Sequence, residues 1–445
     1  MSAQIIETHI SWVILTKKYA YKIKKPVDFG FLDFSTLAKR KYYCEEEIRI
    51  NKIYAPDLYV KVIGYTVKDK VIDYAIVMNQ FDQQNLFLSL LKSHELKPEY
   101  LANLAQQLAA IHQQAEMAPG TFGSPENIFF PVQQNFDQIR PFLQKLNNQK
   151  LLDQLNHCEK WAQEQYKILL PVLKSRKNKK NIRACHGDLH LGNIVLYHNK
   201  PMMFDAIEFN DNLRFTDTMA DVGFLLMDLD EKNQSALGNV FLNEYLTLTG
   251  DYEGLKILRF YQAYRAVVRA KIKLFETNIS WSEYETSMNL AEKYTESQKP
   301  ELFIMHGISG SGKSTRAKQL ASKLNAIHLR SDVERQRLSI DKTERYSEVS
   351  NKKVYNQLYS LTKDLLEAGY SMVVDATFLK KAQRDLFRQL SFPFHIVPCD
   401  VDDKMRETWL RDRSQDYSEA DFTIAQQQRE ALEPLTLEER NYIYA

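Results

Sequence analysis

The sequence predicts two domains, a mixed α+β domain followed by an α/β domain built on a parallel sheet. The chain has 445 residues, more than the roughly 250 to 300 at which a single core stops growing. Short apolar stretches typical of strands open the chain, and long helical patterns replace them after about residue 85. Beyond about residue 300, short apolar strands alternate with helical segments, which is the pattern of a parallel sheet covered by helices.

The first 82 residues predict a small sheet that carries one helix. The expected strands are residues 12–15, 19–23, 59–65 and 71–78, and the expected helix is the charged stretch 39–54. Helical spacing dominates from about 85 to 180, where Leu101, Leu104 and Leu108 recur on one face. Short strands are expected between 182 and 204, followed by helices to about 298. This organisation predicts a small lobe at about 1–82 and a helical large lobe at about 83–298.

The boundary between the domains is expected near residue 298, where a polar stretch is followed by an apolar strand at 302–305. The first domain is thus predicted to span 1–298 and the second 299–445. Further strands of the second domain are expected at 327–329, 372–374 and 395–398, with helical patterns between them.

Composition limits the classes of function. Lys and Arg number 59 against 57 Asp and Glu, a formal charge of +2, which lacks the basic excess typical of nucleic-acid binding. The four cysteines are scattered without a CxxC pair, so buried, reduced thiols are expected in place of zinc ligands or disulfides. Lysines interrupt every apolar stretch near the N-terminus, and a cytoplasmic protein with no membrane segment is expected.

The strongest motif is a glycine-rich turn that directly follows the strand at 302–305. It fits GxxxxGK[ST], and its candidate phosphate-binding residues are Gly307, Ser309, Gly310, Ser311, Gly312, Lys313, Ser314 and Thr315. Backbone N–H groups of such a loop surround phosphate oxygens, Lys313 neutralises the β and γ phosphates, and the Ser314 hydroxyl ligates Mg²⁺. The motif predicts that this domain binds ATP with Mg²⁺.

A carboxylate and a guanidinium follow the second strand of this domain one helical turn apart, Asp332 and Arg335. Such a pair can deprotonate and hold an acceptor hydroxyl. The alternative is that Asp332 caps a helix and Arg335 is exposed. Asp375 and Thr377 end the next strand, and their role stays open.

A charged helical segment at 402–413 carries Arg406, Arg411 and Arg413. Arginines in a lid over the nucleotide could neutralise charge on the transferring phosphoryl group, and Arg411 and Arg413 are the candidates. A solvated helix face is the alternative reading of each.

In the first domain, a loop after a short strand reads His186-Gly-Asp188-Leu-His-Leu-Gly-Asn193. A carboxylate and an amide five residues apart suit a catalytic loop in which Asp188 accepts the proton of a substrate hydroxyl and Asn193 holds Mg²⁺. The apolar strand after it delivers Asp205 as a second metal ligand. The order of these residues predicts a protein-kinase-like bilobal fold.

The phosphate-pairing lysine of this domain is expected on the strand 19–23. Lys22 is the candidate, with Glu47 on the next helix as its ion-pair partner, and Lys24 is the alternative because it lies on the same strand face. Residues 76–81 are expected to form the adenine hinge. No GxGxxG precedes Lys22, so the phosphate-covering loop is expected to be short or absent. Arg265 and Arg269 lie one helical turn apart and face either an acceptor site or a salt-bridged surface.

The two halves resemble known families. The HGD loop with its downstream Asn193, and Asp205 without a following Phe-Gly, are similar to the aminoglycoside phosphotransferase family; Asp28-Phe29-Gly30 precedes the loop and is not the metal segment. The P-loop with Asp332 and Arg335 resembles the polynucleotide kinase and zeta-toxin branch of P-loop kinases. As a whole, the chain resembles a bacterial fusion of an aminoglycoside-phosphotransferase-like domain with a P-loop domain of AAA type.

The resemblance implies transfer of a phosphoryl group from ATP to a hydroxyl of a small-molecule or nucleotide-containing acceptor. Asp188 and Asp332 are the candidate bases. Alternatives are a 5′-hydroxyl kinase for RNA or DNA with an accessory first domain, which the modest charge disfavours, a toxin-like role, and an ATP-binding switch. A switch needs phosphate contacts but no general base.

Overall fold

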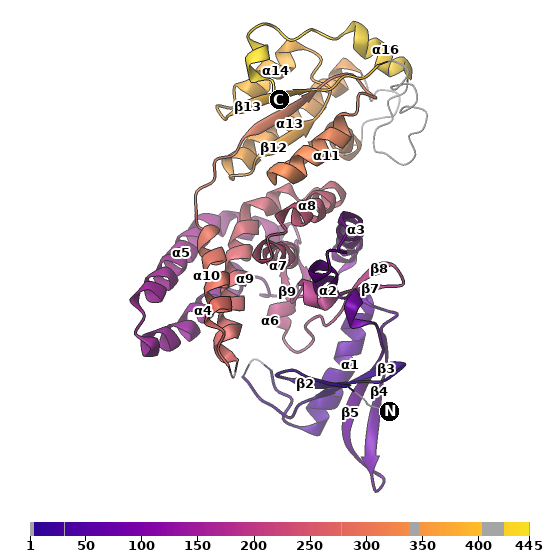
Figure 1. The fold of residues 1–445 in the computed structure, drawn as a ribbon, viewed down its shortest axis with the longest axis vertical. Helices are drawn as coiled ribbons and strands as arrows, with labels where there is room; N and C mark the ends of the chain where they lie inside the picture. Colours follow the sequence, from indigo (N-terminus) through magenta and orange to yellow (C-terminus); the bar gives the residue numbers. More distant parts are fainter. Residues whose placement is uncertain (1–3, 31, 277, 339–346, 403–421, 445) are drawn as a thin grey trace. The chain divides into compact units, whose positions relative to one another are not determined.

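The computed structural model describes residues 4–30, 32–276, 278–338, 347–402 and 422–444 (Figure 1). The chain forms two compact units, and each is discontinuous in sequence. The first unit comprises Met1–Gln234 and Ile257–Thr295, and the second comprises Ser235–Lys256 and Glu296–Ala445. The sequence had assigned residues 235–256 to the first domain, whereas in the structure they pack with the second unit.

The first unit opens with a five-stranded antiparallel sheet in the order β1-β2-β3-β5-β4. Its strands are β1 (Gln4–Glu7), β2 (Ser11–Leu15), β3 (Tyr19–Lys24), β4 (Tyr59–Val67) and β5 (Lys70–Asn79), and helix α1 (Leu37–Tyr54) lies between β3 and β4 in sequence. Strand β1 was not expected. It is a largely exposed edge strand, so it lacks the apolar alternation that marks a half-buried strand.

Strand β3 and helix α1 place charged side chains inside this lobe. Alternation along β3 buries Ala20, Lys22 and Lys24 on one face. Helix α1 begins after Thr36, whose side chain accepts a hydrogen bond from the Lys39 N–H at 3.2 Å. Its buried face carries Glu47. The two lysines and the glutamate are therefore brought together by elements that are adjacent in sequence.

The rest of the first unit is mainly helical. Its helices are α2 (Phe87–Lys92), α3 (Pro98–Gln114), α4 (Pro125–Leu146), α5 (Gln149–Asn178), α6 (Asp211–Arg214), α7 (Thr218–Glu231), α9 (Leu255–Phe275) and α10 (Trp281–Lys293), with 3₁₀ turns η1 (Gln83–Asn85) and η2 (Leu191–Asn193). Its strands are β6 (Ile182–Ala184), β7 (Ile194–Tyr197), β8 (Lys200–Met203) and β9 (Phe215–Asp217). The antiparallel pairs β6·β9 and β7·β8 flank the loop that contains Asp188.

The second unit contains a four-stranded parallel sheet in the order β11-β12-β10-β13. Its strands are β10 (Leu302–His306), β11 (Ile327–Arg330), β12 (Met372–Asp375) and β13 (Phe394–Pro398). Its described helices are α8 (Ser235–Thr249), α11 (Lys313–Leu324), α12 (Ser331–Arg337), α13 (Glu348–Glu367), α14 (Lys381–Arg388) and α16 (Phe422–Glu430), with 3₁₀ turns η3 (Tyr252–Gly254) and η4 (Glu439–Tyr442).

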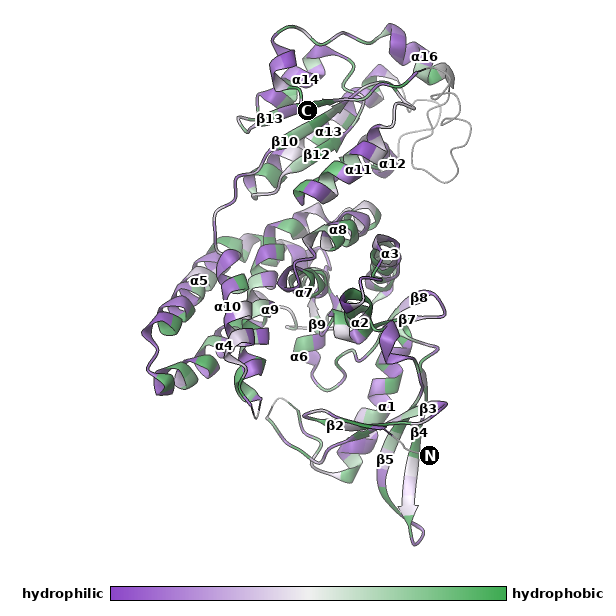
Figure 2. Cartoon of the chain, in the orientation of Figure 1, coloured by the Kyte–Doolittle hydropathy of each residue, from purple (hydrophilic) through white to green (hydrophobic). Residues whose placement is uncertain are grey.

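The central strands β10 and β12 of this sheet are buried along their whole length, as expected for parallel strands covered on both faces. Figure 2 shows hydrophobic colours on these strands and mixed colours on the surrounding helices. Because the strands are parallel, their carboxyl ends meet at one edge of the sheet, which is where ligands bind in open α/β folds.

Two expectations from composition can be compared with the structure. All four cysteines, Cys44, Cys158, Cys185 and Cys399, are buried free thiols, as expected. Among the described residues, no helix has both the length and the apolar character needed to cross a bilayer.

Candidate active sites

The glycine-rich loop of the second unit connects β10 to α11. Gly310 and Gly312 have φ angles of 78° and 77°, a left-handed backbone that side chains disfavour. At Gly307, an added Cβ would lie 2.2 Å from the carbonyl oxygen of Cys399, so a side chain is excluded there by a neighbouring backbone. The loop therefore needs its glycines for shape, and α11 begins directly after it at Lys313.

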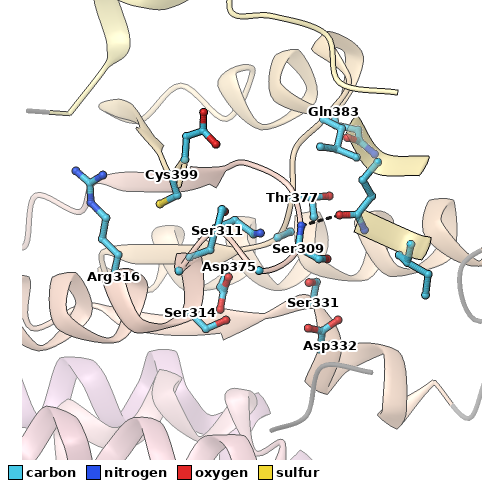
Figure 3. A pocket seen from close by; sticks show the side chains of 18 of the residues that line it. Ser309, Ser311, Ser314, Arg316, Ser331, Asp332, Asp375, Thr377, Gln383 and Cys399 are labelled. Carbon is cyan, nitrogen blue, oxygen red and sulfur yellow. Dashed lines mark hydrogen bonds between the residues drawn. The ribbon is translucent and has the colours of Figure 1, made fainter. Parts of the chain in front are cut away.

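A cavity of about 940 Å³ lies over this loop. Its walls include every residue from Ser309 to Thr315, whereas Gly307 is not among the lining residues. Asp332 and Arg335, from α12, line the same cavity, and Figure 3 shows Asp332 and Ser331 across from the loop residues. The structure thus brings together the phosphate-binding motif and the carboxylate–guanidinium pair, which are separate in sequence.

Two donors of the loop form hydrogen bonds to oxygen atoms of the protein. The Ser309 N–H donates to Oε1 of Gln428, from α16, at 2.7 Å, a contact drawn as a dashed line in Figure 3. Lys313 Nζ donates to the Ile308 carbonyl at 2.7 Å. The buried Ser311 Oγ has no hydrogen-bond partner among the described residues. Donors held in this way fit an anionic ligand with several acceptor oxygens.

Asp375, at the end of β12, adds a second carboxylate to the cavity. His328 Nε2 on β11 lies 3.2 Å from its Oδ2, and Arg330 Nε lies 3.9 Å away. Burial would raise the pKa of Asp375, but the His328 hydrogen bond and the charges of His328, Arg330 and Lys313 hold it at about 2. Asp375 is therefore ionised at neutral pH. The sequence singled it out but left its role open.

The remaining wall of the cavity is mixed, with apolar residues such as Leu379 and Ile424 beside several polar side chains. Asn351, Tyr355, Thr377, Lys380 and Gln383 line it. Tyr355 Oη accepts a hydrogen bond from the Phe378 N–H at 2.9 Å and lies 3.3 Å from Thr377 Oγ1. These side chains suit a hydroxyl-rich or otherwise polar molecule beside Asp332. Arg406, Arg411 and Arg413 lie outside the described residues.

In the first unit, the loop with the HGD sequence places Asp188 against Asn193. Asn193 Nδ2 donates to Asp188 Oδ2 and to the Asp188 carbonyl, each at 3.0 Å. His190 Nε2 lies 3.5 Å from the same carboxylate. Burial would raise the pKa of Asp188, but the charge and hydrogen bond of His190, with the charges of Arg269 and Arg265, hold it well below its ordinary value. The carboxylate is therefore available as a proton acceptor.

This loop is held by acidic residues of α7 that sequence reasoning missed. Asp221 accepts from the backbone N–H groups of His186 at 2.7 Å and Gly187 at 2.8 Å. Asp228 accepts from the Leu191 N–H at 2.9 Å. The signal was present, because buried carboxylates within a helix as apolar as α7 need specific partners.

Arg265 and Arg269 are also tied to this loop. Arg265 Nη2 donates to the Gly187 carbonyl at 2.9 Å, and Arg269 Nη2 lies 3.4 Å from Asp228 Oδ1. Both guanidinium groups lie over the Phe224 ring. Arg265 is buried and supports the loop backbone, so it does not lie on the salt-bridged surface that was one of the two expectations. The charges of both arginines act on Asp188.

Lys22 and Lys24 share Glu47 as a partner but differ in their second partner. Lys22 Nζ lies 2.8 Å from Glu47 Oε1 and also pairs with Asp205. Lys24 Nζ lies 2.6 Å from Glu47 Oε2 and 2.5 Å from Glu208 Oε1. Burial would raise the pKa of Glu47, but the two lysines lower it to about 2. The expected pair of Lys22 and Glu47 is present, and Asp205 is adjacent to it.

Three further expectations concern the small lobe. Strands β1 and β2 are joined by only three residues, 8–10. This connection is short, in line with the expectation of a short phosphate-covering loop. The hinge segment ends at Phe81, whose ring centroid lies 5.3 Å from that of Phe204, the residue before Asp205. Asp28, of the Asp-Phe-Gly sequence, accepts from the Gly30 N–H at 2.9 Å in the connection between β3 and α1.

Comparisons with known proteins also find two domains in this chain. Residues 40–258 match the model of the phosphotransferase enzyme family, and residues 302–435 match the model of an AAA domain. An uncharacterized protein of Mycobacterium tuberculosis (strain H37Rv) is 27% identical over 409 residues, which cover 87% of this chain and 81% of that protein.

Solved structures with local similarity were also found. An ethanolamine kinase of Plasmodium vivax is 11% identical, covers 66% of this chain and 81% of its own, and has a TM-score of 0.39. A sugar kinase of Janibacter sp. HTCC2649 is 21% identical, covers 32% of this chain and 82% of its own, and has a TM-score of 0.28. On the two family matches, residues 40–258 belong to the phosphotransferase enzyme family and residues 302–435 form an AAA domain.

Proposed function

We propose that this protein is an ATP-dependent phosphotransferase whose P-loop unit transfers the γ-phosphoryl group of ATP to a hydroxyl of a small-molecule or nucleotide-containing acceptor. The observation that carries the proposal is the single cavity of about 940 Å³ lined by Ser309–Thr315 on one side and by Asp332 and Arg335 on the other. A donor site for phosphate and a base for a hydroxyl within one cavity are what phosphoryl transfer requires.

The residues fit a magnesium nucleotide. The N–H groups of the loop and Lys313 would hold the β and γ phosphates, and Ser314 with Asp375 would hold Mg²⁺, directly or through water. The ion supplies charge neutralisation between the β and γ phosphates when it is bound. Asp375 suits this role because its pKa of about 2 keeps it charged.

The chemistry of the step follows from the positions of the two groups on α12. Asp332 accepts the proton of the acceptor hydroxyl, and Arg335 orients the acceptor or balances its charge. The hydroxyl oxygen forms a bond to the γ phosphorus while the bond from that phosphorus to the β–γ bridging oxygen breaks, and ADP leaves. If they lie over the cavity, Arg411 and Arg413 would neutralise charge on the transferring group.

A second transfer site is proposed in the first unit, with Asp188 as base and Asn193 and Asp205 as metal ligands. Lys22 is the better candidate for the phosphate-pairing lysine, because its second partner is Asp205, whereas that of Lys24 is Glu208. Burial and the neighbouring charge of Glu47 hold the pKa of Glu208 above its ordinary value in spite of Lys24. The side chains of Lys24 and Glu208 are both almost fully buried, which supports a structural role for this pair.

The acceptor can be sought directly. Purified full-length protein is incubated with γ-labelled ATP, Mg²⁺ and separate pools of sugars, sugar acids, nucleosides, nucleotide sugars and short RNA with 5′-hydroxyl ends. Removal of a general base costs roughly 10²- to 10⁴-fold in rate, so Asp332→Asn should abolish most transfer by the P-loop unit. Asp188→Asn should abolish any transfer carried out by the first unit.

The variants also separate this proposal from the alternatives. Label on RNA alone would favour the 5′-hydroxyl kinase. Binding of ATP without transfer in any pool, unchanged by Asp332→Asn or Asp188→Asn, would favour the ATP-dependent switch and contradict the phosphotransferase proposal.

A further inference from the structure

The edge strand β11 of the P-loop sheet is covered by two asparagines of α8. Asn243 Oδ1 accepts from the His328 N–H at 2.7 Å, and Asn243 Nδ2 donates to the Ala326 carbonyl at 3.1 Å. Asn239 Nδ2 donates to the same carbonyl at 2.9 Å and is itself buried. The Asn243 amide thus pairs with the backbone of β11 as a neighbouring strand would, which satisfies an otherwise open edge.

The end of α8 is bound by the helix that carries the proposed base. Arg337, in the last turn of α12, donates through Nη2 to the carbonyls of Leu246 at 2.9 Å and Thr247 at 2.5 Å. Carbonyls in the last turn of a helix lack intrahelical partners, and a guanidinium is a strong donor to them. At Gly250, an added Cβ would lie 3.0 Å from Arg337 Nε, so this arginine packs closely on the chain that follows α8.

Buried partners fix Arg337 in this position. It forms an ion pair with Glu334, on the same helix, and its Nη1 lies 3.4 Å from Tyr252 Oη. Glu334 is buried, and a buried carboxylate is stable only with such a partner. The chain after α8 is also fixed at Leu255, because Tyr370 Oη donates to the Leu255 carbonyl at 2.9 Å.

Of the two elements held by α8 and the residues after it, α12 carries residues of the cavity, and β11 contacts one of them, Asp375. Helix α12 spans only Ser331–Arg337 and bears Asp332 and Arg335 on its first turns. Strand β11 bears His328, which lies 3.2 Å from the Asp375 carboxylate. A short helix has little stability of its own, so its position depends on contacts such as those of Arg337.

We propose that residues 235–256, although they fall within the stretch matched by the phosphotransferase family model, act as a positioning element of the P-loop site. Asn243 fixes β11 and through it His328, and Arg337 fixes α12 and through it Asp332 and Arg335. The loop that grips phosphate receives no contact of this kind from Asn243 or Arg337. Through Arg337 the segment supports the acceptor side of the cavity, and through Asn243 and His328 it supports Asp375, the proposed Mg²⁺ ligand. It also packs against α11, the helix that follows the phosphate-binding loop. This inference rests on the proposed function for its effect on turnover.

The test uses full-length Arg337→Ala, Arg337→Lys and Asn243→Asp. Asn243→Asp keeps an acceptor for the His328 N–H but sets a carboxylate oxygen against the Ala326 carbonyl. A hydrogen bond from a charged group contributes about 1.5 to 3 kcal/mol, which corresponds to roughly 10- to 100-fold. Amide hydrogen exchange of α12 should therefore accelerate by about tenfold or more in Arg337→Ala, with partial recovery in Arg337→Lys. Exchange of β11 should accelerate in Asn243→Asp.

Function is measured on the same proteins. In Arg337→Ala the dissociation constant of ADP should stay within about twofold of wild type, while phosphoryl transfer should fall by about tenfold or more, a split that general destabilisation does not produce. Arg440→Ala, an exposed arginine of the same unit, is the control and should change neither quantity. Unchanged exchange of α12 in Arg337→Ala and of β11 in Asn243→Asp would overturn the inference. If wild type shows no transfer, the proposed function fails, and the exchange data alone decide the positioning role.

Discussion

Two oxygen atoms, one from a side chain and one from the backbone, pair with donors of the P-loop that the proposed function assigns to nucleotide phosphates. Gln428 supplies an oxygen to the Ser309 N–H, and the Ile308 carbonyl supplies one to Lys313. The sequence located the loop because GxxxxGKS fixes glycines and a lysine at set spacing. It gave no sign of Gln428, because a glutamine that meets a loop 119 positions earlier in the chain follows no local pattern.

Replacement of Gln428 by alanine should strengthen ATP binding. The glutamine oxygen competes with phosphate for the Ser309 N–H, and a hydrogen bond of this kind contributes about 0.5 to 1.5 kcal/mol. Its loss should lower the dissociation constant of ATP by a few-fold and at most about tenfold. Isothermal titration gives the value, with Gln426→Ala, an exposed neighbour outside the cavity lining, as the control. Weaker binding in Gln428→Ala would mean that Gln428 contacts bound nucleotide.

The ionisation of Asp375 predicts a pH-dependent stability. Its pKa of about 2 lies below the ordinary 3.8, so its charged form favours the folded state. That stabilisation is fully present above about pH 4 and is lost as the pH falls through about 2. Asp375→Asn should therefore have a free energy of unfolding lower than that of wild type at pH 7, by on the order of 2 kcal/mol, and a lower melting temperature. Both differences should shrink at pH 3. Melting curves by circular dichroism give the comparison. A difference that is the same at both pH values would contradict the assigned pKa.

Among the elements, the loop that contains Asp188 depends on a helix that follows it in sequence. The carboxylates of α7 accept the N–H groups of His186, Gly187 and Leu191, and Arg265 of α9 binds the Gly187 carbonyl. Sequence patterns located most strands and helices because buried faces recur at fixed periods. They missed β1, which is exposed, and β9, which has three residues. They also missed the contacts of Asp221, since no period marks a side chain that bonds to a distant backbone.

Asp221→Ala should destabilise the first unit more than an exposed substitution does. The change leaves the buried N–H groups of His186 and Gly187 without their acceptor, and each unsatisfied group costs about 1 to 3 kcal/mol. We expect a loss of at least about 2 kcal/mol in the free energy of unfolding, measured by urea titration. Asp153→Ala on the exposed face of α5 is the control, expected within about 0.5 kcal/mol of wild type. Equal stability of the two variants would show that Asp221 does not hold the loop.

Across the whole molecule, each unit has its own core and its own candidate site, and both units are discontinuous in sequence. The change from helical patterns to a strand and glycine-rich turn near residue 300 indicated where the chain passes for the last time from the first unit to the second. The membership of residues 235–256 was not predictable, because the bonds that tie α8 to β11 and the residue before it are made by two asparagines, which no periodic pattern marks. Motifs therefore located the residues of each candidate site, while the contacts that hold those residues in place emerged only from the fold.

Nucleotide should stabilise the second unit selectively. A ligand that binds only the folded form at about 100 times its dissociation constant adds about 2.7 kcal/mol. ADP with Mg²⁺ should therefore slow amide exchange across β10, β12 and α11. Lys313→Ala should remove this protection, because the Lys313 ammonium group is expected to supply the main positive charge that pairs with the β phosphate. Lys323→Ala, on the exposed face of α11, is the control and should keep the protection. Protection that persists in Lys313→Ala would place the nucleotide elsewhere.

The most direct test of the central claim, that the P-loop cavity both binds ATP and transfers its terminal phosphoryl group, compares transfer and binding in Asp332→Asn. Transfer from γ-labelled ATP to the acceptor found by screening is measured beside the dissociation constant of ADP. We predict a loss of roughly 10²- to 10⁴-fold in transfer with binding within about twofold of wild type. Transfer at the wild-type rate in Asp332→Asn would contradict the claim.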